Sequence, residues 1–248
     1  MTSPSAEDFR ALARSSPWRW STLRFTVQWS GDSHRDRSLR AWLRRPDRLR
    51  VETVDGELLQ VIRERRQPSD VAAPTPERRP DGLVARRPVS RLLSVDDPMY
   101  QSYFWVAMLD PAELADGGSS FDERDVDLPA LSVDEVVPVD HGGRPAWEAV
   151  VRTTPHYEPR CGCCSLLRDR RIDELEWGGE NQLAEYPEAY RVRLDVGTGV
   201  CVLTEAIGGS NAGAGHDLRI EAVDDPMADE LFVEPRRGLF RRGWSPVQ

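Results

Sequence analysis

The segment Cys161-Gly-Cys163-Cys164 gathers three of the four cysteines of this 248-residue chain within four positions. Thiolates are the side chains that soft metal ions such as Zn²⁺ and Cu⁺ prefer. A fourth ligand is available in His156, a short distance before the segment, or in Cys201. The residue types therefore mark Cys161, Cys163, Cys164 and His156 as a candidate metal site.

Two other interpretations of this cysteine segment stay open beside the metal. Zinc sites usually combine two C-x2-C pairs, and C-x-C-C departs from that spacing. The adjacent Cys163 and Cys164 point in different directions along an extended chain, so one ion binds both only where the chain turns. The alternatives are a redox or structural disulfide and plain packed thiols, which behave as small hydrophobic side chains and are the commonest outcome.

No other stretch carries a motif for catalysis or for a cofactor. The glycine-rich segment Gly208–Gly215 lacks the Lys-Ser/Thr of a phosphate loop and lies between two expected strands, which favours a hairpin loop. The four histidines share no spacing, and no nucleophile elbow is present. The acidic clusters at 122–127 and 173–176 are typical of solvated loops. We therefore expect a protein that is not an enzyme and that uses no cofactor.

Residues 20–62 form the segment around which the other elements are organised. Its first part alternates apolar and polar residues, as a half-buried strand requires. The apolar members are Leu23, Phe25, Val27 and Trp29. Further apolar runs follow, and Asp55-Gly56 is a hairpin signal between the last two. The pattern predicts an antiparallel meander with strands at 20–29, 39–45, 49–52 and 58–62.

The rest of the chain mixes helices with further strands. Asp-Pro pairs at 97–98, 110–111 and 225–226 indicate helix starts, because Asp caps the first amides and Pro gives up no bond there. Helices are expected at 6–14, 99–109, 112–115 and 227–231. Strands are expected at 133–139, 146–153, 190–196, 200–207 and 218–223.

These elements predict a single domain over residues 1–235 followed by a flexible tail at 236–248. A chain of this length fits one β-rich domain with a core large enough to need no metal or disulfide. Within the domain we expect a long Arg- and Pro-rich loop at 64–90 and a cysteine-containing insertion at 155–188.

Charge is unevenly distributed along the chain, which has a formal net charge of −9 and no lysine. Residues 1–91 hold 19 Arg against 12 acids, and residues 92–248 hold 14 Arg against 30 acids. We expect the two halves to neutralise one another across strands. The alternative is a charged lobe that steers a protein partner. The acidic total argues against nonspecific nucleic-acid binding.

No apolar run approaches the length of a membrane span, so no transmembrane segment is expected. The N-terminus as written has no basic and apolar leader, from which we expect a cytoplasmic protein with reduced thiols.

Short motifs give the chain a resemblance to a known family. Ala41-Trp-Leu-Arg-Arg-Pro46 followed by Leu49-Arg-Val-Glu52 resembles the strand, Trp, Arg-Pro, strand signature of the LolA lipoprotein carriers. Leu231-Phe232-Val-Glu-Pro235 is similar to the Leu-Phe-x-x-x-Pro motif that ends the domain in that family. The superfamily includes the RseB-type sigma-factor regulators and actinobacterial lipid-transfer lipoproteins. The expected order of helices and strands is similar too.

The resemblance implies an α+β fold, namely a curved antiparallel sheet that stays open as a half-barrel, with helices plugging its concave face. It also implies an apolar cavity for acyl chains, and hence a non-enzymatic binding protein for a lipid or another apolar small molecule. Arg45 matches the family's arginine before proline, which tethers the helical lid, and it must find acceptors inside. The expected ligand-binding residues are Leu23, Phe25, Val27, Leu43, Arg45, Val51, Met99, Tyr103 and Val106.

A second hypothesis follows from the composition of the expected lid helix. Its aromatic residues can fill the cavity instead of gating it, and they are Tyr100, Tyr103, Phe104 and Trp105. The chain would then be a protein-interaction or regulatory module that keeps the fold without a ligand. A thiol or metal site at Cys161–Cys164 is the third hypothesis.

Overall fold

The computed structural model describes residues 3–31, 38–64, 75–88, 97–117, 128–180 and 182–234. The expected tail at 236–248, the acidic cluster at 122–127 and parts of the 64–90 loop lie outside these residues. No helix in the described ranges is long and apolar enough to cross a membrane.

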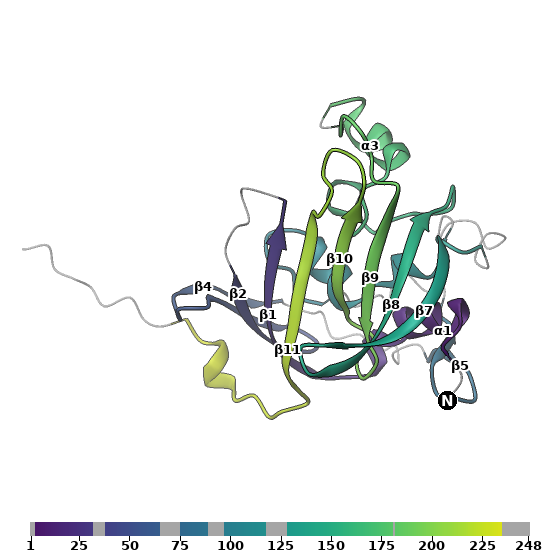
Figure 1. The fold of residues 1–248 in the computed structure, drawn as a ribbon. Coiled ribbons are helices and arrows are strands. Elements are labelled where there is room, and N and C mark those ends of the chain that lie inside the picture. Colours follow the sequence, from purple (N-terminus) through teal and green to yellow (C-terminus); the bar gives the residue numbers. More distant parts are fainter. Residues whose placement is uncertain are drawn as a thin grey trace, which may run out of the picture.

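A single antiparallel sheet of nine strands forms the body of the protein (Figure 1). Its order is β4-β3-β2-β1-β11-β10-β9-β8-β7. The meander supplies β1 (Thr22–Ser30), β2 (Leu39–Arg44), β3 (Arg48–Thr53) and β4 (Leu58–Arg63). The other strands are β7 (Leu131–His141), β8 (Arg144–Thr153), β9 (Ala189–Asp195), β10 (Cys201–Ile207) and β11 (Gly215–Val223). The four-strand meander and the later hairpins are therefore confirmed.

The predicted alternation sets which face of the sheet is buried. Phe25 lies opposite Ala41 on β2, and Ala41 lies opposite Val51 on β3, so the inward residues form rows across the strands. All three are fully buried. On the other side of β1, Phe25 lies opposite Ile220 of β11. Because successive side chains of a strand point to opposite faces, this register turns one face of the meander into the core.

The sheet is curved and open, as expected. Register shifts at Arg24/Phe25, Val51/Glu52, Cys201/Leu203 and Val133/Val136 mark irregularities that increase local twist and bend the strands. Figure 1 shows that the direction of the strands changes from the β2–β4 side of the sheet to the β7–β11 side. Among the described residues β4 and β7 are the two edges and do not pair with each other. The half-barrel with helices on its concave side is thus the observed fold class.

Two helices supply the layer under the sheet. Helix α1 (Ala6–Ser15) begins with a capping box between Ser5 and Asp8, and it buries Phe9 and Leu12. A 3-10 turn, η1 (Ser16–Trp18), follows it. Helix α2 (Phe104–Leu109) has every residue buried, and the turn η3 (Ala112–Leu114) comes next. These helices and the inner face of the sheet share one apolar core.

Helix α2 is shorter than the predicted helix at 99–109, which is a correction. Gln101 adopts φ +62°, a left-handed conformation that interrupts a right-handed helix. The Asp97-Pro98 pair therefore does not start α2, whose N-cap position is Tyr103. Met99 precedes the helix and does not belong to its apolar stripe.

The helix expected at 227–231 is replaced by a single 3-10 turn, η5 (Asp229–Phe232). The local signal at Asp225-Pro226 is overridden by tertiary hydrogen bonds. The carbonyl of Asp225 accepts from the Thr22 hydroxyl at 2.7 Å, and that of Met227 accepts from the Arg44 guanidinium at 2.6 Å. Phe232 is nonetheless buried, at 1% exposure, with the Arg44 guanidinium over its ring.

Two segments contain more structure than the sequence predicts. In the 64–90 loop, β5 (Glu77–Arg78) pairs with β6 (Val84–Arg86), and the amide of Val84 donates to Ser15 Oγ of α1 at 2.8 Å. In the 155–188 insertion, a turn η4 (Gly162–Cys164) is followed by α3 (Arg170–Trp177). Asp169 caps α3 by accepting two amide hydrogens, so a capping signal was present.

Several arginines of the basic half of the chain pair with acids of the acidic half. Arg24 and Arg40 both reach Glu221 of β11, with N–O distances of 3.0 and 3.1 Å. Four further arginines of the first 91 residues pair with acids beyond residue 92. These pairs are Arg14–Asp116, Arg44–Asp229, Arg45–Asp97 and Arg87–Asp110. The expected neutralisation across strands is confirmed for the two pairs with Glu221, and each of the other four pairs joins the two halves through at least one residue outside the strands.

Candidate functional site

The concave face of the sheet holds most of the residues expected to bind an apolar ligand. Their exposed fractions are between 0 and 1% for Leu23, Phe25, Val27, Leu43, Val51 and Val106. A side chain with no exposed surface borders no space large enough for water, whether outside the protein or inside it. In this conformation the expected cavity is therefore closed at these six positions.

Aromatic side chains of the segment around α2 occupy the space in front of the sheet. The ring centroid of Trp105 lies 5.7 Å from that of Phe25 and 5.9 Å from that of Trp29. Tyr100 meets Trp105 edge to face at 5.2 Å. Tilted and edge-on contacts at these separations are favourable aromatic pairs. The aromatic lid thus fills the trough, which is the arrangement that the second hypothesis anticipates.

Met99 and Tyr103 do not lie in the core with the other expected ligand residues. Their exposed fractions are 37% and 38%. Both precede α2, and the left-handed turn at Gln101 separates them from each other. The expected set is therefore brought together only in part, with six residues inside, two at the surface and Arg45 beneath the segment that leads to α2.

Arg45 is directed inward and is fully engaged. Its Nε and Nη2 donate to the two carboxylate oxygens of Asp97, both at 2.7 Å, and Nη1 donates to the carbonyls of Ser16 and Trp20. The guanidinium carbon lies 3.3 Å from the centre of the Trp20 ring. The sequence predicted inward acceptors for Arg45 but assigned Asp97 to a helix cap. The bidentate pair joins the end of β2 to the segment that precedes α2.

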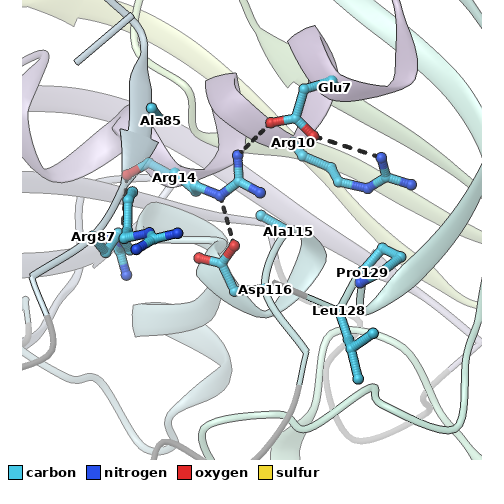
Figure 2. A pocket seen from close by; sticks show the side chains of 10 residues that line it. Glu7, Arg10, Arg14, Ala85, Arg87, Ala115, Asp116, Leu128 and Pro129 are labelled. Carbon is cyan, nitrogen blue, oxygen red and sulfur yellow. Dashed lines mark hydrogen bonds and ion pairs between the residues drawn. The ribbon is translucent and has the colours of Figure 1, made fainter. Parts of the chain in front are cut away.

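A surface pocket of about 250 Å³ lies beside α1, away from the expected cavity residues (Figure 2). Arginines from α1 and from the β6 segment line it together with two acids. These residues are Arg10, Arg14, Arg86, Arg87, Glu7 and Asp116. Ala85, Ala115, Leu128 and Pro129 complete the wall. No sequence motif predicted this site, although the excess of arginine in residues 1–91 was a signal for it.

The arginines of this pocket differ in how far their charge is neutralised. Arg14 contacts Glu7 at 2.7 Å and Asp116 at 2.6 Å. Arg10 donates to the carbonyl of Leu131 at 3.0 Å, but its nearest carboxylate contact among the described residues is Glu7 at 3.7 Å. Burial raises the pKa of Asp116 against the opposing effect of Arg14. The guanidinium of Arg10 is therefore better placed than that of Arg14 to bind another anionic partner.

Three comparisons place the chain against known proteins. No protein-family model matches it, and no curated protein matches it. Among solved structures, the crystal structure of MucB aligns at 16% identity with a TM-score of 0.41 and covers 91% of this chain. The crystal structure of MucB in complex with MucA(peri) aligns at 14% identity with a TM-score of 0.41 and covers 92% of this chain. The structure of the Pseudomonas aeruginosa MucA/MucB complex aligns at 16% identity with a TM-score of 0.39 and covers 91% of this chain.

The chain spans about three fifths of the length of these solved structures. The covered shares are 62% of the MucB chain, 59% of the chain in the MucA(peri) complex and 60% in the third structure.

The cysteine segment forms a compact cluster at the surface. The three Sγ atoms are separated by 2.9 Å (Cys161–Cys163), 3.4 Å (Cys163–Cys164) and 3.2 Å (Cys161–Cys164). Cys163 is exposed, and the other two are half-buried. Burial, followed by hydrogen bonds from the neighbouring thiols, raises the pKa of Cys164 to about 12.

The other two expected or possible metal ligands do not join this cluster. Among the described residues, the group of potential ligand atoms contains the three thiols and not His156. Cys201 is fully buried in β10, where its thiol donates weakly to the carbonyl of Leu203 at 3.6 Å.

A buried pair, Glu113 and Tyr157, fixes the insertion that carries the cysteines. The Tyr157 hydroxyl donates to Glu113 Oε1 at 2.7 Å, and the amide of Leu166 donates to the same oxygen at 2.9 Å. The Tyr157 oxygen in turn accepts from the amide of Leu167 at 3.2 Å. Burial raises the pKa of Glu113 and raises that of Tyr157 well above its ordinary value. These bonds hold both ends of residues 157–167 against η3.

Proposed function

We propose that this chain is a non-enzymatic binding protein that engages an acidic segment of another protein at the arginine pocket. The observation that carries the proposal is the environment of Arg10, whose guanidinium borders the pocket with Glu7 at 3.7 Å as its nearest described carboxylate. A partner carboxylate would supply the charge-assisted bonds that this side chain lacks.

The size and charge of the pocket support a protein side chain as the occupant. Four arginines and two acids line a volume of about 250 Å³, which suits one or two carboxylate side chains better than an acyl chain. The chain as a whole has a formal charge of −9, so this concave positive site stands out against an acidic background. Arginines outnumber acids on its wall, and an excess of one charge sign in a cleft concentrates ligands of the opposite sign.

The closed concave face supports the same choice. The residues expected to contact an apolar ligand are packed against the protein's own aromatic side chains, with Trp105 at 3% exposure. The motif resemblance to LolA carriers and RseB-type regulators belongs to this proposal as a fold kinship. Of the two roles in that superfamily, interaction with a protein needs no cavity between sheet and helices.

The test is binding of a fluorescent hexaglutamate peptide, followed by anisotropy, to the full chain and to two variants. We expect saturable binding that weakens as salt rises, and at least a fivefold loss of affinity in Arg10→Gln. The matched control is Arg219→Gln on β11, an exposed arginine outside the pocket, which should bind as the wild type does. Equal loss in both variants, or no saturable binding to the wild type, would contradict the proposal.

A second candidate function keeps the apolar ligand, because one observation favours it. The segment leading to α2 is held through the Arg45–Asp97 pair, and α2 itself is six residues long. Displacing so short a helix would uncover Phe25 and Trp29, which Trp105 of α2 contacts. Native mass spectrometry of protein purified without detergent tests this candidate, since an acyl-sized adduct supports it and a clean apo mass excludes it.

A further inference from the structure

We propose that Cys161, Cys163 and Cys164 form a three-thiolate site for a soft metal ion, Cu⁺ or Zn²⁺. This site lies in the 155–188 insertion and is independent of the arginine pocket. Its basis is the convergence of three sulfur atoms, with every Sγ–Sγ separation between 2.9 and 3.4 Å.

The local backbone explains how a C-x-C-C sequence can aim three thiols at one point. Cys161 is extended, with φ −142° and ψ 121°, and η4 then begins at Gly162. The amide of Cys164 donates to the carbonyl of Cys161 at 3.3 Å, which closes the turn. In an extended chain, Cys163 and Cys164 would point to opposite sides. The turn removes that obstacle.

The arrangement fits a metal site better than a disulfide, because three thiols converge and a disulfide joins only two. A disulfide requires an S–S distance of about 2.05 Å, and all three separations are far longer. Thiolates bound at roughly 2.3 Å to one ion stand roughly 4 Å apart, so the three pairs need to widen by roughly 0.6 to 1.1 Å. Cys163 is exposed, so an ion can enter from solvent.

The surroundings add a negative charge and leave little room for other groups. A Cβ placed on Gly162 would lie 2.7 Å from Oε2 of Glu176, which shows that this carboxylate of α3 covers the turn. The neighbouring Arg160 directs its guanidinium to Asp110 at 2.9 Å. A cation bound by the thiols would therefore also be attracted by Glu176.

The ligand count indicates which ions fit. Within the described ranges the cluster holds three sulfur ligands and no histidine or carboxylate. Structural Zn²⁺ is almost always four-coordinate, so zinc would need a fourth ligand from solvent or from another molecule. Cu⁺ shares the preference for thiolates, and we expect it to bind more tightly here. Loading either ion exchanges three S–H bonds for three metal–sulfur bonds and releases three protons.

The experiment is a competition between the full-length reduced protein and a chromogenic chelator, performed without oxygen, with Zn²⁺ and Cu⁺ in separate arms. We expect the wild type to withhold one equivalent of at least one ion. Cys161→Ser, Cys163→Ser and Cys164→Ser should each weaken retention at least tenfold. Cys201→Ala is the matched control and should retain the ion as the wild type does. Circular dichroism establishes that each variant is folded.

Two outcomes would overturn the proposal. One is a wild type that yields both ions to the chelator as readily as the three serine variants do. The other is a disulfide within the cluster, detected when protein alkylated during lysis shows two unreacted cysteines among residues 161–164. A failure of acidic-peptide binding would leave this result untouched, because the two tests use different residues and probes.

Discussion

Arg45 and Asp97 form a bidentate ion pair that links the end of β2 to the segment before α2. Both N–O distances are 2.7 Å, and the Asp97 side chain is 5% exposed. The pair extends into a small network, because Trp20 stacks on the guanidinium and its indole donates to Ser16 Oγ at 3.1 Å. Ser16 Oγ then donates to the carbonyl of Leu109 at the end of α2. Arg45 thereby connects both ends of the segment that fills the trough.

Replacing one member of this pair should lower the free energy of unfolding much more than replacing both. Arg45→Met leaves a buried carboxylate without its partner, and we expect a loss of about 3–5 kcal/mol in the free energy of unfolding. The double variant Arg45→Met/Asp97→Leu removes the unpaired charge and should be the more stable of the two. Urea denaturation measures both. The control is Arg152→Met, whose pair with Asp134 is half exposed and is worth at most about 1 kcal/mol.

Trp105 decides whether the concave face is closed. Trp105→Ala should lower the free energy of unfolding by about 3–5 kcal/mol and open a dry space beside Phe25 and Trp29. Native mass spectrometry with added fatty acid should then show an adduct for the variant and none for the wild type. Trp177→Ala, at a position 38% exposed, is the control and should change stability by less than about 0.5 kcal/mol. An adduct of equal intensity in both proteins would mean that Trp105 does not close the site.

The pair Glu113–Tyr157 should govern the local stability of the cysteine insertion. Tyr157→Phe removes the acceptor of the Leu167 amide and one donor to Glu113, with an expected cost of about 1–3 kcal/mol. Hydrogen exchange at the Leu167 amide should accelerate more than exchange at amides of β1. Tyr103→Phe, at an exposed position, serves as the control. Uniform acceleration throughout the chain would indicate global destabilisation without a local role.

His216 should make the protein less stable in acid. Its Nε2 donates to the carbonyl of Cys201 and its Nδ1 accepts from the Thr204 hydroxyl, each at 2.9 Å, so the buried ring is neutral. Burial lowers its pKa from 6.5 to about 4. Between these values the unfolded chain binds the proton and the folded chain does not. The contribution of His216 to the free energy of unfolding is therefore at its maximum above pH 6.5. It falls by about 3 kcal/mol as the pH drops toward 4.

The variant His216→Gln isolates this contribution, because glutamine can donate and accept without titrating. The difference in unfolding free energy between wild type and variant should be constant from pH 7 to 8 and should shift by about 3 kcal/mol in favour of the variant between pH 6.5 and 4. Parallel pH profiles for the two proteins over that range would show that His216 does not titrate as its burial implies.

Local patterns in the sequence determined most of the sheet. The alternation of Leu23, Phe25 and Val27 specified β1 and its buried face, because a strand's side-chain period is a local property of the backbone. The capping box at Ser5 and Asp8 determined the start of α1 for a similar reason. The basic and acidic halves likewise indicated that arginines and acids would pair across the fold.

Only the tertiary structure decided where the sites are. The local sequence around Asp97 is typical of a helix cap. In the fold, however, Asp97 pairs with the guanidinium of Arg45, which is 52 positions away in the sequence but in direct contact in space. The convergence of the three cysteines depends on a turn that C-x-C-C does not encode by spacing alone. Likewise, the closure of the trough depends on the fit of Trp105 against β1. Such contacts join residues remote in sequence, and their energies depend on burial and distance, which a sequence pattern does not contain.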